Sequence, residues 1–271
     1  MIRTQRNSGQ QRGGNGIPIR ILIALAFAAF SLFSYFSSSQ YNDVTGEDQR
    51  VSMTPNQEIA LGLQSVPSLV QEFGGEYRDS EVQDAIDEIG FDLVRNSVAA
   101  DTPWQWEFTV LDSNVLNAFA LPGGQVFITT EMLSQLETID AVAGVLSHEI
   151  VHVLARHGAQ RVAQNDLTNG LLGAVSVASG NANATQTAAM IAQLVNLQYG
   201  REDELQSDSI GVCLMIDAGY DPQGMVEVQQ ILAQASAGAS QPEFFSSHPN
   251  PDNRIQRIQE AIDTADEFCP Q

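Results

Sequence analysis

The sequence predicts an α+β fold that is mainly helical, with a small antiparallel sheet inserted between helices. Apolar residues recur at helical spacing over most of the chain, and only 104–130 shows the alternation of half-buried strands. Glycine and proline separate the predicted elements. With 271 residues, of which 43% are hydrophobic, the chain is long and apolar enough to build one substantial core.

The N-terminal region has the pattern of a membrane-targeting segment. Residues 1–16 are polar and basic, and 17–36 are apolar. About 20 apolar residues suffice to span a bilayer as a helix, and the basic flank predicts that the N-terminus stays in the cytoplasm. A signal anchor and a cleaved signal peptide both fit, and the length of the apolar run favours the anchor. Polar residues 37–52 are interpreted as a linker, and 53–271 as the folded domain.

Helices and strands then follow in order. A helix is predicted over 55–73, because Thr54 is a suitable N-cap and Pro55 suits the first helical position. Gly74 and Gly75 end it. A second helix is predicted at 80–99, followed by strands at 104–110, 115–121 and 125–130. Helices are then predicted at 131–137, from about Asp140 onwards, and at 188–199, 202–218 and 221–235. A loop at 241–250 precedes a last helix that begins at Asn250-Pro251. The intervening 169–190 fits either a mobile helical hairpin or a surface connection.

The helix from about Asp140 carries the sequence H-E-x-x-H. His148 and His152 are four residues apart, so a helix presents both imidazoles on one face, where they can bind one metal ion. Glu149 is placed to take a proton from water. Zinc suits this pattern because it accepts imidazole nitrogen and keeps an open position in catalytic sites. A helix with two unrelated histidines is the alternative.

Two histidines leave such a site one protein ligand short. The longer pattern H-E-x-x-H-x-x-G-x-x-H fails, since Ala155 and Gly158 stand where glycine and histidine would be needed. His157 lies about 140° around the helix from His152, so it is expected to point away and to be structural or to act behind a ligand. Carboxylates on the 202–218 helix remain. Glu204 and Asp208 share one face, and the spacing leaves Glu202 as a rival.

The charge distribution excludes one class of partner. The formal net charge is −21, and the chain has 33 acidic residues against 12 basic ones, four of which precede residue 41. Nucleic-acid binding requires a basic surface. We therefore expect no nucleic-acid partner.

Four ordered motifs resemble the membrane-associated zinc metallopeptidases of the CAAX prenyl protease, Oma, HtpX and BepA type. They are H-E-I-V-H at 148–152, N-A-F-A-L-P-G-G at 117–124, E-x-x-x-D at 204–208, and His248-Pro249 followed by Arg254. Ser207 departs from the alanine usual in the third motif. The single N-terminal apolar segment is most similar to the Oma and LoiP type.

The resemblance implies a gluzincin-type zinc endopeptidase with one zinc ion per subunit. His148, His152 and Glu204 would be the metal ligands, and Glu149 the general base. His248 would be either a resting-state ligand in the fourth zinc position or a hydrogen-bond donor to the tetrahedral intermediate. Implied substrates are misfolded or damaged envelope polypeptides, bound in extended form near 117–120.

The apolar N-terminal segment and its basic flank predict a protein attached to the inner membrane, with its catalytic domain in the periplasm or another extracytoplasmic space. Secretion to the periplasm after signal cleavage is the alternative. A non-catalytic, zinc-stabilised chaperone or scaffold of the envelope is the rival function. Outside the cytoplasm Cys213 and Cys269, the only cysteines, could form a disulfide, and the sequence leaves this pairing open.

Overall fold

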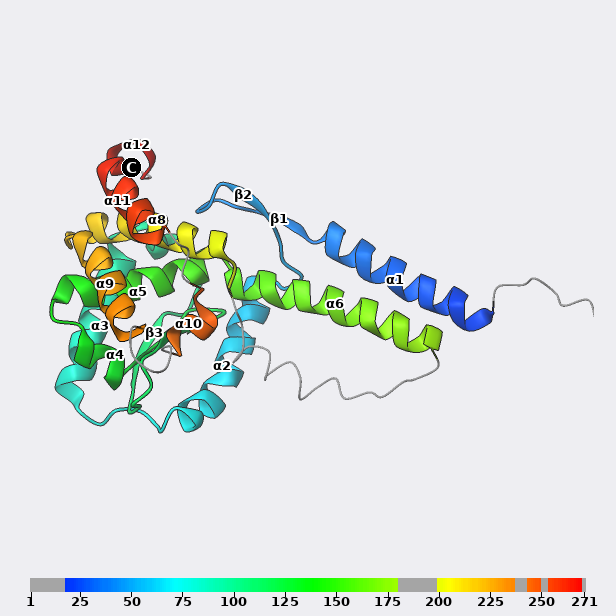
Figure 1. Cartoon of the computed structure of the whole chain (residues 1–271), viewed down its shortest axis with the longest axis horizontal. Coiled ribbons are helices and arrows are strands. Elements are labelled where there is room, and N and C mark those ends of the chain that lie inside the picture. Colours follow the sequence, from blue (N-terminus) through cyan, green and yellow to red (C-terminus); the bar gives the residue numbers. More distant parts are fainter. Residues whose placement is uncertain (1–17, 180–198, 237–242, 250–252, 270–271) are drawn as a thin grey trace, which may run out of the picture.

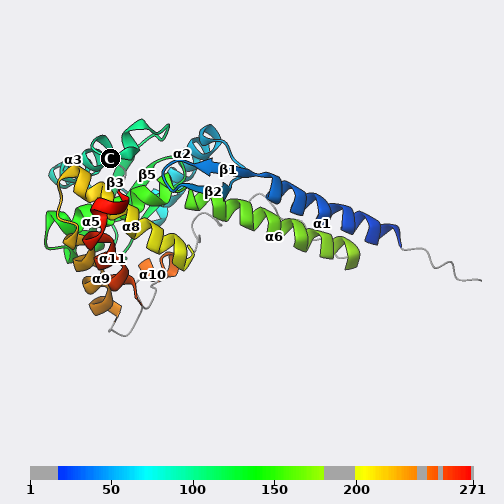
Figure 2. The same cartoon turned by 90° about the horizontal axis from the view of Figure 1, so that it is seen from above.

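A helical body with a projecting two-helix arm makes up the computed structural model, which describes residues 18–179, 199–236, 243–249 and 253–269. The arm consists of α1 (Ile19–Ser37) and α6 (His157–Ser179), which lie side by side in both views (Figures 1 and 2). Among the described residues, α1 is the one helix long and apolar enough to cross a membrane. The predicted apolar segment is therefore a helix.

The sheet has three strands, β3 (Glu107–Leu111), β4 (Ala118–Leu121) and β5 (Gln125–Thr129), in the order β3–β5–β4. The prediction of an antiparallel sheet is wrong for one pair, because β3 runs parallel to β5. Gly123 and Gly124 have φ of 97° and 115° and fold β5 back onto β4 in a tight turn. Since β5 occupies the place beside β4, β3 pairs with the far side of β5. β4 remains an edge strand.

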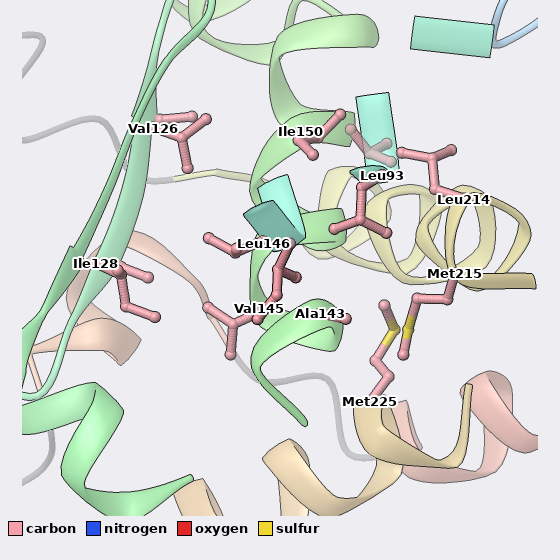
Figure 3. Close-up of a cluster of buried hydrophobic side chains, with 14 of the residues drawn as sticks. Leu93, Val126, Ile128, Ala143, Val145, Leu146, Ile150, Leu214, Met215 and Met225 are labelled. Carbon is pink, nitrogen blue, oxygen red and sulfur yellow. The ribbon is translucent and has the colours of Figure 1, made fainter. Parts of the chain in front are cut away.

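Helix α5 (Ile139–Leu154) passes through the centre of the body, and all its residues from Ala143 to Leu154 are buried. Figure 3 shows β5 on one side of α5, with α3 (Ser80–Arg95), α8 (Arg201–Ala218) and α9 (Gln223–Ser236) around the rest. Gly144 lets α9 approach closely, because an added Cβ would lie 3.1 Å from the backbone of Met225. The helix that carries the H-E-x-x-H motif is thus held on all sides.

The residues predicted as a linker instead form a β hairpin, β1 (Ser39–Asn42) and β2 (Glu47–Arg50). The carbonyl groups at the end of α5 need donors from outside the helix. The Asn42 side chain supplies one, donating to the Leu154 carbonyl at 2.8 Å. The hairpin therefore helps to fix the end of the central helix, a tertiary role that its polar sequence does not indicate.

The other elements follow the predictions with shifted ends. α2 (Pro55–Glu72) begins at the predicted Thr54 cap, and α8 ends at Gly219, whose φ is 83°. The predicted 80–99 helix stops at Arg95 and is followed by a 3-10 turn, η1 (Val98–Asp101), because the Ser97 side chain caps that turn. Two predicted strands begin three residues late, at Glu107 and Ala118. α4 (Thr130–Gln135) follows β5.

The C-terminal region contains one unpredicted helix. α10 (Phe244–Ser247) lies within the predicted 241–250 loop, and α11 (Arg254–Asp263) and α12 (Ala265–Phe268) follow it. The predicted 188–199 helix and the predicted start at 250–251 lie almost wholly outside the described residues. Of the predicted hairpin or connection at 169–190, the described part is the end of α6.

A disulfide joins Cys213 of α8 to Cys269 after α12, with their Cα atoms 5.4 Å apart. The pairing that the sequence left open is therefore present in the structure. It ties the C-terminal end of the chain to the helix that carries Glu204, across a sequence separation of 56.

We predict that Cys269→Ser lowers the free energy of unfolding by about 2–4 kcal/mol, because the unfolded chain regains the freedom that the cross-link removes. Urea denaturation followed by circular dichroism measures the loss. Wild-type protein in reducing agent is the control and is expected to show the same midpoint as the variant. An unchanged midpoint in both samples would contradict the stabilising role of the bridge.

Candidate metal centre

The two histidines of the H-E-x-x-H motif lie on one face of α5, as the spacing predicts. His148 and His152 are both buried, and their Nε2 atoms are 3.0 Å apart. Glu149, also buried, lies beside them. The helix begins at Ile139, and the side chain of Thr138 caps it. Because α5 is packed on all sides, the direction of each imidazole is fixed by the core.

Two distant segments complete the cluster. Glu204, in the first turn of α8, places Oε2 3.4 Å from Nε2 of His148 and Oε1 3.5 Å from Nε2 of His152. His248, just after α10, places Nδ1 3.1 Å from Oε1 of Glu204 and 3.4 Å from Nε2 of His148. The four side chains offer donor atoms that all lie within 4.8 Å of one another. The rival Glu202 is exposed.

The donor spacing fits a tetrahedral metal ion. Ligand atoms about 2.1 Å from a tetrahedral zinc lie roughly 3.4 Å from each other. The measured separations of 3.0 Å between the two Nε2 atoms and 3.1–3.5 Å to the Glu204 and His248 donors are close to that value. Imidazole nitrogen and carboxylate oxygen are also ligands that zinc accepts. These side chains could therefore hold one zinc-sized ion.

Buried charge at the site also favours a cation. The carboxylates of Glu149, Glu204 and Asp208 face the single guanidinium of Arg254, and all four side chains are buried. If all three acids are ionised and the histidines are neutral, as metal ligation requires, the formal charge of the site residues is −2 before any metal binds. Buried charges without partners are costly. A divalent cation would neutralise this negative charge.

The pKa values of the site residues reflect that charge. Burial lowers the pKa of His148, but hydrogen bonds to Asp208 and Glu204 outweigh it and raise the value to about 9. Burial and the nearby His148 hold the pKa of His152 well below its usual value, which favours the neutral form that binds metals. Burial raises the pKa of Glu149. Burial would also raise the pKa of Glu204, but the nearby His248 and hydrogen bonds from His148 and His248 hold it well below its usual range.

A second layer of side chains orients His148. Its Nδ1 lies 2.9 Å from Oδ1 of Asp208. Arg254 donates to both oxygens of that carboxylate, from Nε at 2.7 Å and from Nη2 at 2.9 Å. The carboxylate fixes the ring so that Nε2 points to the other donors. The aspartate of the E-x-x-x-D motif and the downstream arginine therefore act together to orient His148.

His157 does not point away from His152, so that prediction is wrong. Its Nδ1 lies 2.9 Å from Nδ1 of His152, and its Nε2 lies 2.9 Å from the amide oxygen of Gln206. The prediction extended α5 past its end, but α5 stops at Leu154 and Arg156 has a φ of 55°. The left-handed turn brings His157 behind His152, where the expected role behind a ligand agrees with its contacts.

These contacts select the tautomer of His152. The Gln206 oxygen only accepts hydrogen bonds, so His157 Nε2 must carry the proton and its Nδ1 has the lone pair. His157 Nδ1 then accepts from Nδ1–H of His152. This leaves the Nε2 lone pair of His152 free to bind a metal.

Tyr199 is a site residue that the sequence did not identify. Its ring stacks on His152 with centroids 3.9 Å apart, and its backbone N–H donates to the Ser247 carbonyl at 2.9 Å. It therefore connects His152 to the segment that carries His248. Tyr199 lies outside every motif, and no spacing relates it to His152, so only the tertiary structure places it here.

This geometry, a helix with H-E-x-x-H and a glutamate from a separate helix, is that of a metallopeptidase site. The model for peptidase family M48 matches residues 79–262, and the chain belongs to that family. The resemblance found in the sequence is thus confirmed.

Similar proteins have names consistent with this assignment. The chain is 26% identical over 238 residues to the mitochondrial metalloendopeptidase OMA1 of Saccharomyces cerevisiae. The aligned region covers 85% of this chain and 64% of that relative. The chain is 32% and 28% identical to the beta-barrel assembly-enhancing proteases of Yersinia pestis and Escherichia coli K12, covering 63% of this chain and 37% of each relative. The chain spans less than two thirds of the length of these relatives.

We predict that His157→Ala weakens zinc binding by about 10- to 100-fold, because His152 loses the acceptor that fixes its tautomer. Competition with a chromophoric chelator measures the affinity. His157→Asn is the matched variant, since its Oδ1 can accept the same hydrogen bond, and it is expected to recover part of the affinity. Wild-type affinity in both variants would contradict the role assigned to His157.

Proposed function

We propose that this chain is a zinc-dependent endopeptidase that cleaves unfolded or extended polypeptides of the cell envelope. The proposal rests on the environment of the Glu149 side chain. Its carboxylate is fully buried beside the four donor side chains, and neither oxygen accepts a hydrogen bond from the described residues. A buried carboxylate that accepts no hydrogen bond is costly, so its position favours a chemical role.

His148, His152 and Glu204 would hold one zinc ion per subunit. When bound, that ion supplies Lewis acidity to a water molecule and to the scissile carbonyl. Glu149 takes the proton from the water and later gives it to the leaving amine nitrogen. Burial raises the pKa of Glu149, so its carboxylate is a stronger proton acceptor in the first transfer.

The proposed substrate-binding strand is β4, whose outer edge pairs with no strand in the described part of the chain. The Thr129 N–H donates to the Asn117 carbonyl, and the Asn117 N–H donates to the Thr129 hydroxyl, so Asn117 faces β5 and the backbone groups of Ala118 and Ala120 face away from it. A cavity beside this edge is lined by Ala120, His152 and Tyr199. An extended polypeptide added to β4 would therefore run past the metal ligands.

We further propose that α1 anchors the protein in a membrane, with 1–16 in the cytoplasm and the folded domain in the periplasm or another extracytoplasmic space. The apolar character of α1 supports attachment. The disulfide supports the location of the domain, because such bonds persist mainly outside the cytoplasm. The relatives named as mitochondrial and β-barrel assembly-enhancing proteases make envelope polypeptides the favoured substrates.

We predict that Glu149→Gln lowers the rate of casein cleavage by about 10²- to 10⁴-fold, the usual contribution of a general base. Glutamine keeps the shape of the side chain and removes its basicity. Zinc content, measured by mass spectrometry, is expected to stay at one per chain in both proteins. Equal cleavage by wild type and variant would overturn the mechanism, and absence of cleavage in both would favour a zinc-stabilised chaperone or scaffold.

His248 occupies a place that water would need. Its Nδ1 lies among the donors, and its Nε2 is 3.5 Å from Oε1 of Glu149. We infer that His248 holds a resting state by competing with water for the fourth metal position. The alternative role, donation to the tetrahedral intermediate, would require the ring to turn away from the other donors.

We predict that His248→Ala raises casein cleavage several-fold, because water gains access to the position that the imidazole occupies. The measurement is the initial rate at equal zinc content, with Ser246→Ala in the same segment as the control. Loss of cleavage in His248→Ala would instead assign the catalytic role. An unchanged rate would contradict both roles.

A further inference from the structure

The contact between α1 and α6 is made by small residues. Ala24, Ala28 and Ser31 recur along α1 on the face that is least exposed, and Ala163 and Ala174 are buried on α6. At Gly170 an added Cβ would clash with the Ser31 hydroxyl. Small residues allow two helices to pack closely where no hydrophobic effect drives them together, as in lipid.

The outer surface of this helix pair is apolar towards its free end. The large side chains Leu25, Phe30 and Phe33 of α1 are 59%, 69% and 72% exposed, and Leu172 of α6 is 59% exposed. The sequence of α6 changes at Gly170, which lies beside Ser31 of α1. Residues 160–169 include Arg161, Asp166 and several amides, whereas 170–179 contain no charged residue. Exposure of such an apolar surface to water is unfavourable.

Polar groups mark where this apolar region ends. Between the helices near the body lies a cavity of about 180 Å³, lined by polar residues that include Ser31 and Ser34 of α1 and Asp166 of α6, together with Phe30, Tyr35 and Leu167. Arg50 donates to the Phe36 carbonyl and lies 5.0 Å from the centre of the Phe36 ring. Arginine with aromatic side chains is typical of the membrane–water interface. α6 becomes polar beside Ser31, and the exposed phenylalanines of α1 continue from there to Phe36, nearer the body.

We propose that the α6 segment 170–179 enters the lipid bilayer beside α1, so that the two helices form one membrane-inserted unit. The segment is ten residues long and would reach about 15 Å into the bilayer, half of its hydrocarbon thickness. The inference rests on the membrane attachment by α1 proposed above. It adds a second inserted segment, which belongs to the peptidase domain itself.

Insertion of α6 would fix the position of the metal centre. α6 begins at His157, which contacts His152, and the chain returns at Tyr199, which stacks on the same imidazole. From His157 to Gly170 the helix rises about 20 Å. The site would therefore lie within that distance of the membrane surface, close to polypeptides that emerge from it. Removal of α1 as a signal peptide would expose the buried face of α6.

Depth-dependent quenching tests this proposal. Because both native cysteines are in the disulfide, an environment-sensitive fluorophore can be attached at one introduced cysteine. Leu172→Cys probes α6, Leu25→Cys probes α1, and Gln164→Cys is the matched control on the polar half of α6. The full chain is reconstituted in phosphatidylcholine vesicles that contain lipids spin-labelled on the acyl chain.

We expect a blue-shifted emission and strong quenching at positions 172 and 25, and neither effect at position 164. Adding Gly170→Leu, which forces the helices apart, should reduce quenching at 172 and leave it unchanged at 25. If 172 behaves like 164 while 25 is quenched, α6 stays in water and the proposal is overturned. If 25 is not quenched either, the membrane attachment itself is wrong. Neither result bears on the proteolytic activity.

Discussion

The interaction on which this structure depends is the concentration of buried charge at one end of α5. Glu149, Glu204 and Asp208 are removed from water together, with Arg254 as the one permanent cation among the described residues in contact with them. Burial of this kind is tolerated only when each charge has a partner in the right geometry. The histidines supply hydrogen bonds, and a divalent ion would supply the missing charge. Helix α5 contributes Glu149 to this group of charges, α8 contributes Glu204 and Asp208, and α11 contributes Arg254.

Rigid packing of α5 makes such a balance possible. The helix is enclosed by the sheet, α3, α8 and α9, so its two histidines have little freedom to separate. At its end Arg156 adopts a left-handed conformation and pairs with Glu58 of α2, with Nε 2.9 Å from the carboxylate. This turn directs the chain into α6 and places His157 behind His152. One backbone feature therefore links the metal site to the arm.

Much of the site was predictable because its chemistry requires fixed spacing. The i and i+4 relations of His148 with His152 and of Glu204 with Asp208 follow from helix geometry alone. The errors have tertiary causes. The orientation of His157 depends on the ion pair between Arg156 and Glu58, which are nearly one hundred positions apart in sequence. The parallel pairing of β3 depends on which side of β5 is free, and the β1–β2 hairpin is stabilised by the end of α5. Tyr199 is placed by packing that no local pattern records.

The central claim, that side chains from three separate segments converge on one metal ion, is tested most directly by zinc K-edge X-ray absorption on the purified chain. The geometry predicts one zinc per chain with nitrogen and oxygen ligands at about 2.0–2.1 Å, at least two imidazoles and no sulfur. A sulfur shell in the spectrum, or a chain that remains folded in excess zinc yet retains no metal, would contradict it.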